Sequence, residues 1–449
     1  RDLVRSRGLG DVYKRQTEEM PQNEREKIVV IGGGFAGLNF IKHIDKKRFD
    51  VTLVDRNNFH SFPPLFYQIA SSGLEPGSIS FPFRREIRRG KAKGIDFHLG
   101  EVEKVDFKNK TVTTQYETIS YDRLVIAAGT TNNFFGNDDL KKYVYTLKST
   151  AQAMRMRDEI LDRLERASIE TDEEAKKKLL SFVVIGGGPA GVEVAGALGE
   201  LKRFIIPREY PTIRQEDLSI VLLEGSDKLL GAMSARSQNE AVRYLEKLMV
   251  DVRLKNLMTR YDKNIVTLSD GSQIYSGMVI WTAGVTGQPI AVENVEEGFM
   301  GRGYRFKVDC YNRVKDTENV YAIGDMSLME TEKYPKGHPQ LAQVAIQQGR
   351  LLARQLNKDE FTEAFEYNDK GTMATVGRNM AVADLGKVHI SGFAAWLCWM
   401  FIHLLSILGM RNKISVLIDW TWSYFSYGTS LRMLLHTSRW PLRERWGEI

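Results

Sequence analysis

Two glycine-rich motifs of the same form carry the chemistry that this sequence could perform. The first is Gly32-Gly33-Gly34-Phe35-Ala36-Gly37, and the second is Gly186-Gly187-Gly188-Pro189-Ala190-Gly191. Each directly follows an apolar run typical of a buried strand, at 27–31 and 181–185. In a strand–turn–helix unit the first glycine allows a tight turn, the second lets backbone approach a pyrophosphate, and the third lets the helix pack on the strand. The pair predicts that one chain binds two dinucleotides.

Each unit also ends in a carboxylate that could bind a ribose. The run 50–54 ends on Asp55, and the run 218–223 ends on Glu224 after an insertion expected at 204–217. A carboxylate at this place accepts from a ribose hydroxyl, while the positive end of the helix faces the phosphates. Because Glu224 would repel a 2′-phosphate, we expect NADH rather than NADPH at the second motif.

A single glycine turn can be no more than a tight loop in an α/β sheet. Here both units continue in the same way, because the run 121–130 contains Ala128-Gly129 and the run 278–285 contains Ala283-Gly284. The repeat is therefore one of whole domains. It predicts an α/β fold with two Rossmann-like dinucleotide-binding domains.

A further strand is expected at 319–325, and it ends on Gly324-Asp325. A carboxylate at the carboxyl end of a strand is well placed to accept from the ribityl chain of a flavin. Alone, Gly-Asp is more often a turn. After a second nucleotide domain, the pattern favours a flavin contact at Asp325.

Length and composition set broad limits on function. The 449 residues contain 43% hydrophobic and 27% charged residues, as in ordinary folded proteins. The net charge of +6 is spread along the chain, so nucleic-acid binding is not indicated, although an anionic membrane surface is compatible. The two cysteines, Cys310 and Cys398, form no CxxC pair and have no metal-ligand spacing. We therefore predict neither a disulfide framework nor a metal site.

The C-terminal part has a different composition. The run 392–410 lacks Lys, Arg, Asp and Glu, is rich in Trp, Phe and Leu, and is followed by Arg411 and Lys413. Its length would permit a transmembrane helix, since about 20 apolar residues span a bilayer. His403, Ser406 and the flanking aromatic and basic residues favour an interfacial, monotopic anchor instead. A dimer interface is the alternative for such an apolar segment.

At this point the chain resembles a known family, the type II NADH dehydrogenases, which are single-subunit NADH:quinone oxidoreductases of respiratory membranes. The resemblance runs from about Lys27 to the C-terminus. It is carried by the stretch 60–70 (HSFPPLFYQIA), by Ala342-Gln343-x-Ala345-x-Gln347, and by Trp281-Thr282-Ala283-Gly284-Val285.

The resemblance implies FAD at the first motif, NADH at the second, and a membrane quinone, either ubiquinone or menaquinone. Hydride would pass from NADH to FAD, and two electrons then to the quinone, without proton pumping. It also implies a peripheral protein on the cytoplasmic face of a bacterial inner membrane, bound to the lipid bilayer surface by an amphipathic helical segment and able to form a homodimer. Its remaining predicted cofactor contacts are Arg56, Val102 and Ala345.

Three further residues are predicted to be catalytic. Gln343 and Gln347 lie one helical turn apart and share a face, so their amides could donate to a quinone carbonyl without adding a charge. Taken without the resemblance, a polar, solvated face shared with Gln348 is the better interpretation. Glu193 is implied by the resemblance to act near nicotinamide and flavin and in protonation of the quinone, while a favourable interaction with the helix dipole is its structural alternative.

The pattern divides the chain into five segments. A non-native leader is expected first, and the natural start is expected near Met20. Two nucleotide-binding domains and a C-terminal anchor follow it. The predicted segments are 1–19 for the leader, 20–150 for the first part of the FAD domain, 151–290 for the NADH domain, 291–390 for the second part of the FAD domain with the quinone-site helix, and 391–449 for the membrane-associating helices.

Two other functions are compatible with the motifs. One is a soluble FAD-dependent NADH reductase of a ferredoxin- or rubredoxin-like carrier, which would not need the segment after Ser391. The other is a nucleotide-sensing membrane flavoprotein with little turnover. Sulfide:quinone oxidoreductases and disulfide reductases need paired redox cysteines, and this chain has no such pair.

Overall fold

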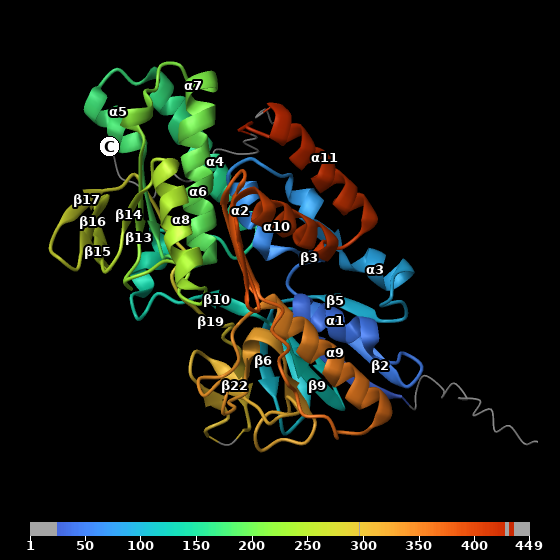
Figure 1. Cartoon of the computed structure of the whole chain (residues 1–449). Helices are drawn as coiled ribbons and strands as arrows, with labels where there is room; N and C mark the ends of the chain where they lie inside the picture. The colour runs from blue at the N-terminus through green and yellow to red at the C-terminus, as the bar shows by residue number, and fades with distance from the viewer. Residues whose placement is uncertain (1–24, 296, 427–430, 435–449) are drawn as a thin grey trace, which may run out of the picture.

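Two five-stranded parallel sheets form the frame of the protein, seen in a computed structural model that describes residues 25–295, 297–426 and 431–434 (Figure 1). The leader segment predicted at 1–19 lies outside the described residues. The first sheet has the order β23 (Val320–Ala322), β9 (Arg123–Ile126), β1 (Glu26–Ile31), β2 (Phe49–Asp55), β5 (Asp96–Leu99). The second has the order β11 (Tyr145–Thr146), β18 (Met278–Trp281), β12 (Ser181–Ile185), β13 (Ser219–Leu223), β14 (Asp251–Arg253).

The two sheets repeat one another down to the register at the glycine turns. Ile31 at the end of β1 pairs with Val54 and Ile126, and Ile185 at the end of β12 pairs with Leu223 and Trp281. The strand before each glycine motif is therefore central in its sheet. The predicted fold class of two Rossmann-like domains is confirmed.

Close backbone contacts explain why glycines occupy both turns. Gly32 has φ +95° and Gly186 has φ +109°, a region that favours glycine. A Cβ atom added to Gly37 would lie 1.9 Å from the Gly32 carbonyl oxygen, and one added to Gly191 would lie 1.8 Å from that of Gly186. The first glycine therefore makes the turn and the last lets the helix approach it.

Helices cover the sheets and connect the two units. In Figure 1, α1 and α9 lie side by side over the first sheet. Helices α6 and α8 lie next to each other against the second. The longer helices are α1 (Phe35–His43), α4 (Thr150–Ile169), α6 (Pro189–Glu200), α8 (Ala235–Lys247) and α9 (Ala342–Lys358). The shorter ones are α2 (Phe66–Ala70), α3 (Phe83–Arg89), α5 (Glu173–Leu179) and α7 (Ile206–Glu209).

Several small sheets, most of whose strand pairs are antiparallel, lie around this frame. One of them, formed by β10 (Thr130–Asn132) and β19 (Val285–Gly287), joins the ends of the two units. The others are four small sheets, in which the β6–β20 and β22–β24 pairs run parallel. They comprise β3 (Phe59–Ser61) with β4 (Ser80–Pro82); β6 (Val102–Asp106), β7 (Thr111–Thr114) and β8 (Thr118–Ser120) with β20 (Ala291–Glu293); β15 (Met258–Asp262), β16 (Ile265–Leu268) and β17 (Gln273–Tyr275); and β21 (Met300–Gly301), β22 (Arg305–Lys307) and β24 (Ser327–Leu328).

A further sheet connects α6, the helix that follows the second glycine motif, to the C-terminal helices. It consists of β25 (Thr372–Gly377), β26 (Met380–Leu385) and β27 (Val388–Ser391), and α10 (Gly392–Ser406) packs on β26. A Cβ atom added to Gly196 of α6 would lie 1.7 Å from the Val376 carbonyl oxygen. The backbones of α6 and β25 are therefore in direct contact, and the hairpin lies between α6 and α10.

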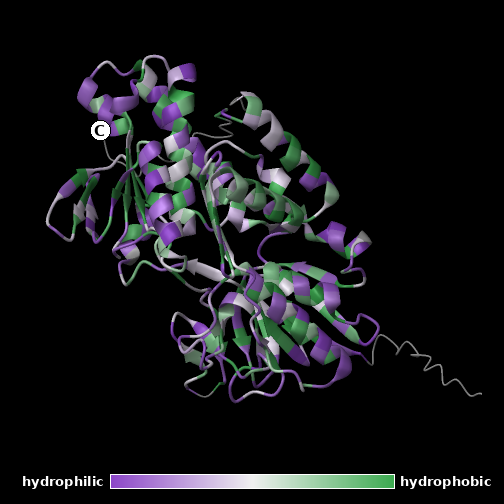
Figure 2. Cartoon of the chain, viewed as in Figure 1, coloured by the Kyte–Doolittle hydropathy of each residue, from purple (hydrophilic) through white to green (hydrophobic). Residues whose placement is uncertain are grey.

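The C-terminal helices α10 and α11 (Met410–Ser426) belong to the main core. Trp399, Val416 and Trp420 are buried in the same hydrophobic cluster as Leu198 of α6 and Phe66 of α2. Figure 2 shows hydrophobic residues in the central strands and along these helices. A turn at Gly409, with φ +84°, separates α10 from α11. Within the described ranges, every helix is too short or too polar to cross a membrane.

We predict that Gly196→Ala separates α6 from β25, because the added methyl group meets backbone. Overpacking of this kind costs about 1–3 kcal/mol, and the thermal midpoint should fall accordingly. Gly231→Ala is the matched control, since a Cβ atom there would meet nothing within 4 Å. Equal melting temperatures for the two variants would contradict the assigned contact.

Candidate functional site

The first glycine turn presents a buried carboxylate and an open helix N-terminus. The Gly33 N–H donates to Asp55 Oδ2 at 2.7 Å, and the Asn57 N–H donates to Oδ1 at 2.7 Å. Burial raises the pKa of Asp55, although these two amides stabilise its charged form. A Cβ atom at Gly34, just before α1, would have nothing within 4 Å. The turn therefore leaves space for a pyrophosphate beside the carboxylate that is predicted to bind a ribose.

Asp325 lies at the same edge of the first sheet, in the turn after β23. Thr130 Oγ1 donates to Asp325 Oδ2 at 3.5 Å, and Lys148 Nζ donates to Thr130 Oγ1 at 3.1 Å. Burial raises the pKa of Asp325, and the positive charge of Lys148 opposes that shift. Lys148 is a neighbour that the sequence motifs did not indicate.

Gln348 supports the Asp325 turn from α9. Its Oε1 accepts from the Gly324 N–H at 2.7 Å and from Ser327 Oγ at 3.1 Å. Its Nε2 is buried and has no hydrogen-bond partner in the described part of the chain. A polar ligand at this edge, such as FAD, would supply an acceptor for this N–H.

The other predicted contacts of the first site differ in position. A Cβ atom at Gly324 would lie 3.0 Å from the Cβ of Ala36 and 3.2 Å from that of Ala345, so these alanines line the turn. Arg56 is half-exposed, with Nη1 3.8 Å from an Oε1 of Glu101. Val102 and Gly129 are half-buried at strand ends. Their contacts with a cofactor stay predictions.

The second turn reproduces the first with a glutamate. The Gly187 N–H donates to Glu224 Oε2 at 2.6 Å, and the Ser226 N–H donates to Oε1 at 2.7 Å. Pro189 and Ala190 begin α6. A Cβ atom added to Gly188, just before them, would meet nothing within 4 Å. A pocket is lined here by Gly186, Gly188, Glu224, Ala283 and Gly284, together with Phe135 and Leu257.

The two sites meet through the small β10–β19 sheet. Thr130 pairs with Gly287, and Asn132 pairs with Val285. In addition, the Gln288 N–H donates to the Gly129 carbonyl at 3.0 Å. The strand ends that follow Ala128-Gly129 and Ala283-Gly284 are thus tied together, which brings the two predicted nucleotide sites next to each other.

Gln343 and Gln347 hold the loop that leads into β25. Gln343 Nε2 donates to the Gly371 carbonyl at 2.9 Å, and Gln347 Nε2 donates to that of Asn368 at 2.9 Å. Their Oε1 atoms accept from the N–H groups of Lys370 at 3.2 Å and Asn368 at 3.0 Å. Each amide keeps a second N–H, so donation to a quinone stays a prediction. The alternative of a solvated face shared with Gln348 is wrong, because Gln348 is fully buried.

Glu193 lies in the second turn of α6, where the influence of the helix dipole has faded. Burial raises its pKa well above the ordinary value, and the Thr375 backbone N–H partly opposes this shift. A raised pKa favours the protonated form of a carboxyl group. The catalytic role of Glu193 stays a prediction.

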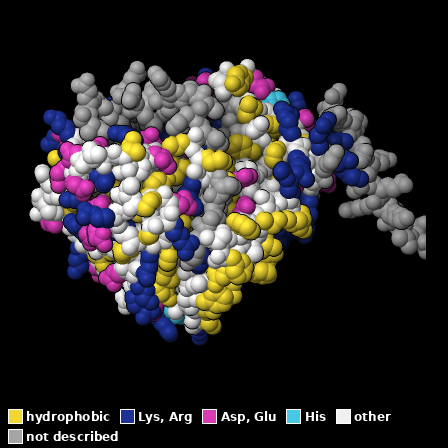
Figure 3. All heavy atoms as spheres, turned by 90° about the horizontal axis from the view of Figure 1, so that it is seen from above, with side chains coloured by type: hydrophobic (Ala, Val, Ile, Leu, Met, Phe, Trp, Pro, Cys, Tyr) yellow, Lys and Arg dark blue, Asp and Glu magenta, His cyan; other side chains and the backbone are white. Residues whose placement is uncertain are grey.

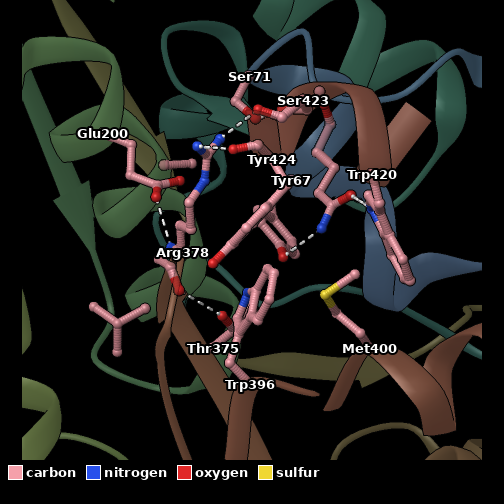
Figure 4. Close-up of a pocket in the computed structure, with 15 residues that line it drawn as sticks. Tyr67, Ser71, Glu200, Thr375, Arg378, Trp396, Met400, Trp420, Ser423 and Tyr424 are labelled. Atoms are coloured by element: carbon pink, nitrogen blue, oxygen red, sulfur yellow. Dashed lines mark hydrogen bonds between the residues drawn. The ribbon is translucent and has the colours of Figure 1, made fainter. Parts of the chain in front are cut away.

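Sequence reasoning missed a cavity at the junction of α2, α6, β25, α10 and α11 (Figure 4). In Figure 4, Tyr67 lies between Glu200 and Arg378 on one side and Trp420 and Met400 on the other. The sequence signal that could have indicated this region is the spacing of Glu193 and Glu200, which lie about two helical turns apart on α6. The lining side chains that carry polar or aromatic groups are Tyr67, Gln68, Ser71, Glu200, Thr375, Arg378, Trp396, Trp420, Ser423 and Tyr424.

Comparison with known proteins agrees with this geometry. Residues 26–349 match the family model described as pyridine nucleotide-disulphide oxidoreductase, and residues 370–426 match that described as NDH2 C-terminal domain. A type II NADH:quinone oxidoreductase of Mycobacterium tuberculosis is 34% identical over 419 residues, covering 90% of this chain and 89% of the relative. The chain belongs to the type II NADH:quinone oxidoreductases.

Other known proteins are similar to this type II enzyme in sequence or in fold. A mitochondrial internal alternative NAD(P)H-ubiquinone oxidoreductase of Solanum tuberosum is 30% identical, covering 90% of this chain and 87% of the relative. NDH2 from Plasmodium falciparum, solved with NADH, has the same fold, with a TM-score of 0.83, 22% identity, and coverage of 92% and 100%. The sulfide:quinone oxidoreductase of Aquifex aeolicus shares the fold at a TM-score of 0.68, 16% identity, and coverage of 90% and 96%.

The residues at the two turns fit the predicted cofactors, FAD at the first and NADH at the second. Both turns have a carboxylate, an open helix N-terminus and a glycine that permits close approach. Cys310 is exposed and Cys398 is partly buried, and both are free cysteines. The predicted domain boundaries stay predictions, and the C-terminal family match begins at residue 370, before the expected boundary at 391.

We predict that Glu224→Gln weakens discrimination against NADPH. Removing one negative charge beside the ribose should raise the ratio of kcat/KM for NADPH to that for NADH by about tenfold. Steady-state kinetics with both nucleotides measure this ratio. Asp251→Asn, which removes an exposed carboxylate from the neighbouring strand β14, should leave it unchanged. An unaltered ratio in Glu224→Gln would show that this carboxylate does not select the nucleotide.

Proposed function

We propose that this chain oxidises NADH at the second glycine turn and reduces a membrane quinone, with FAD held at the first turn between them. A bound flavin supplies a centre that accepts two electrons and passes them on. The protein's part is to hold both nucleotides at the joined strand ends near β10 and β19. The overall reaction is NADH + H⁺ + quinone → NAD⁺ + quinol.

The observation that carries the membrane part of this proposal is a broad apolar surface on α10 and α11. Figure 3 shows a band of hydrophobic side chains there, with Lys and Arg gathered beside it. An apolar patch of this kind, rimmed by basic groups, is typical of proteins that lie in a bilayer interface. Its exposed members are Phe393, Leu397, Phe401, Ile402, Leu405, Met410, Ile414, Leu417, Ile418, Trp422 and Phe425.

The basic residues beside this surface come from α3 and from the start of α11. Arg84, Arg85, Arg88 and Arg411 are exposed. Segment 80–83 contacts α11, because Asn412 Nδ2 donates to the Ser80 carbonyl at 2.9 Å. These arginines would meet anionic headgroups while the apolar band enters the acyl region. We propose the cytoplasmic face of a bacterial inner membrane as the location.

The quinone would approach from the same side. The loop 368–371, held by Gln343 and Gln347, leads into β25, and the β25–β26 hairpin lies between α6 and α10. A quinone leaving the bilayer beside α10 would therefore meet the second N–H groups of Gln343 and Gln347. Either ubiquinone or menaquinone could use such donors. The C-terminal match over 370–426 favours this route over reduction of a soluble carrier.

Charge insertion into the apolar band tests the proposal. We expect Leu405→Asp to lose binding to vesicles containing anionic lipid, because a charge in the apolar face opposes insertion. Turnover with a long-chain quinone dissolved in the vesicles should fall by about tenfold or more, while turnover with a water-soluble short-chain quinone should change less than about twofold. Flotation assays and NADH oxidation rates measure these effects.

The control is Tyr116→Asp, which places the same charge on another exposed hydrophobic residue, in the loop between β7 and β8. It should bind vesicles and turn over like the unmodified protein. Equal vesicle binding by both variants would contradict membrane attachment through α10 and α11. If Leu405→Asp instead converts a dimer to a monomer without loss of vesicle binding, the apolar band is a homodimer interface.

A further inference from the structure

The side chain of Lys148 reaches from the second nucleotide-binding unit to the first. Lys148 follows β11, the edge strand of the second sheet, and its Nζ donates to Thr130 Oγ1 at 3.1 Å. Thr130 belongs to β10, which comes after β9 of the first sheet and pairs with β19 of the second unit. The lysine side chain is half-buried. Its ammonium group therefore lies where the two nucleotide-binding units meet.

The start of α4 fixes the backbone around Lys148. The Lys148 N–H donates to Gln152 Oε1 at 2.7 Å, and the Gln152 N–H donates to Ser149 Oγ at 3.2 Å. This reciprocal pair resembles a capping box, which satisfies N–H groups at the start of a helix. A lysine directly before the N-cap does not stabilise the helix, because the positive end of the helix dipole repels a cation. Stabilisation of α4 therefore does not explain the charge at this position.

Asp325 is the carboxylate that faces this ammonium group. Thr130 Oγ1 connects the two, because it accepts from Lys148 and donates to Asp325 Oδ2 at 3.5 Å. Burial raises the pKa of Asp325, and the charge of Lys148 is the largest influence that opposes this shift. Burial lowers the pKa of Lys148, and the charge of Asp325 opposes that shift in turn. Each group therefore stabilises the charged form of the other.

A second cation, Arg305, also acts on Asp325. Its guanidinium group is fixed to backbone, because Nε donates to the Ser327 carbonyl at 2.9 Å and Nη2 donates to the His338 carbonyl at 2.9 Å. The positive charges of Lys148 and Arg305, together with the positive end of α4, thus surround one carboxylate. This edge of the first sheet carries more positive than negative charge.

Reduction of a flavin by NADH adds negative charge at this edge. A hydride consists of two electrons and one proton, so its transfer leaves NAD⁺ and a reduced flavin that has gained one negative charge. A nearby cation stabilises that charge, and it does so more strongly where bulk water is excluded. An excess of positive charge beside the first site therefore favours the reduced cofactor over the oxidised one.

From this arrangement we propose that Lys148 sets the reduction potential of the bound FAD. Its ammonium group, held by Thr130, offsets the charge of Asp325 and stabilises the negative charge that the flavin gains on reduction. The inference rests on the proposed function, in which NADH reduces FAD at the first glycine turn. Lys148 takes part in no bond that forms or breaks, and it shifts the equilibrium between the two states of the cofactor.

The variant Lys148→Met removes the charge and keeps a long side chain. We expect the equilibrium constant for two-electron reduction of the bound flavin to fall by about tenfold, which lowers the midpoint potential by about 30 mV. The measurement equilibrates the full holoenzyme with a chemical reductant and a redox dye of known potential, and it follows the visible flavin absorbance. NADH and quinone are both left out, so the result does not depend on turnover.

Three companion variants separate charge from shape. Lys148→Arg keeps the charge, so its equilibrium constant should stay within about twofold of that of the unmodified protein. Thr130→Val removes the hydroxyl that accepts from Lys148 Nζ, with little change in volume, and should shift the potential in the same direction by a smaller amount. Lys141→Met removes an exposed lysine from the same connecting segment and should leave the potential unchanged.

Release of FAD from the diluted holoenzyme is the second readout. In Lys148→Met the Kd of oxidised FAD should stay within about threefold of the unmodified value, whereas reduced FAD should bind about tenfold more weakly. Binding and reduction are thermodynamically linked, so the ratio of the two Kd values must change by the same factor as the equilibrium constant for reduction. A lysine that only joined the two units would alter both Kd values equally.

An unchanged potential in Lys148→Met would overturn the proposal, and so would equal weakening of oxidised and reduced FAD. If Lys148→Met does not fold, Thr130→Val decides in the same way, because an unchanged potential there would overturn the proposal as well. Failure of quinone to reoxidise the unmodified, NADH-reduced protein would instead contradict the proposed function. The potential is measured without either substrate, so the two failures are distinguishable.

Discussion

The contact between the backbones of α6 and β25 determines how the two halves of the molecule meet. Only hydrogen at Gly196 allows the Val376 carbonyl to approach so closely. This approach places the hairpin against the nucleotide-binding helix and α10 against the hairpin. The start of β25 is then reached by Gln343 and Gln347, and its end brings Arg378 to Glu200 and to α11. The C-terminal helices and α6 are thereby parts of one packed unit.

Both glycine turns use the same solution for binding an anionic dinucleotide. A carboxylate at the end of the neighbouring strand accepts from the second glycine N–H, at 2.7 Å in one turn and 2.6 Å in the other. That bond fixes the turn while the following helix keeps its first N–H groups open. Duplication of this unit, with β10 and β19 joining the two copies, explains how one chain can hold an electron donor and an electron carrier close together.

Features set by local sequence could be predicted, whereas features set by distant contacts could not. The strands, the turns, and the positions of Asp55 and Glu224 follow from short motifs whose geometry each residue type dictates. Without the resemblance, the sequence favours a solvated face that includes Gln348, because the hydrogen bonds of Gln348 to Gly324 and Ser327 depend on how α9 packs against the turn after β23. The cavity around Tyr67 and Glu200 likewise exists only after α11 folds back over α2, which no periodicity in the sequence indicates.

The central claim is that electrons enter from NADH and leave to a quinone through one bound flavin. The most direct test follows the visible flavin absorbance of the full, vesicle-bound protein under anaerobic conditions, first on addition of NADH and then of quinone. We predict that NADH bleaches the absorbance and that quinone restores it, with one quinol formed for each NADH oxidised. Bleaching by NADH with no recovery on addition of quinone would contradict this claim.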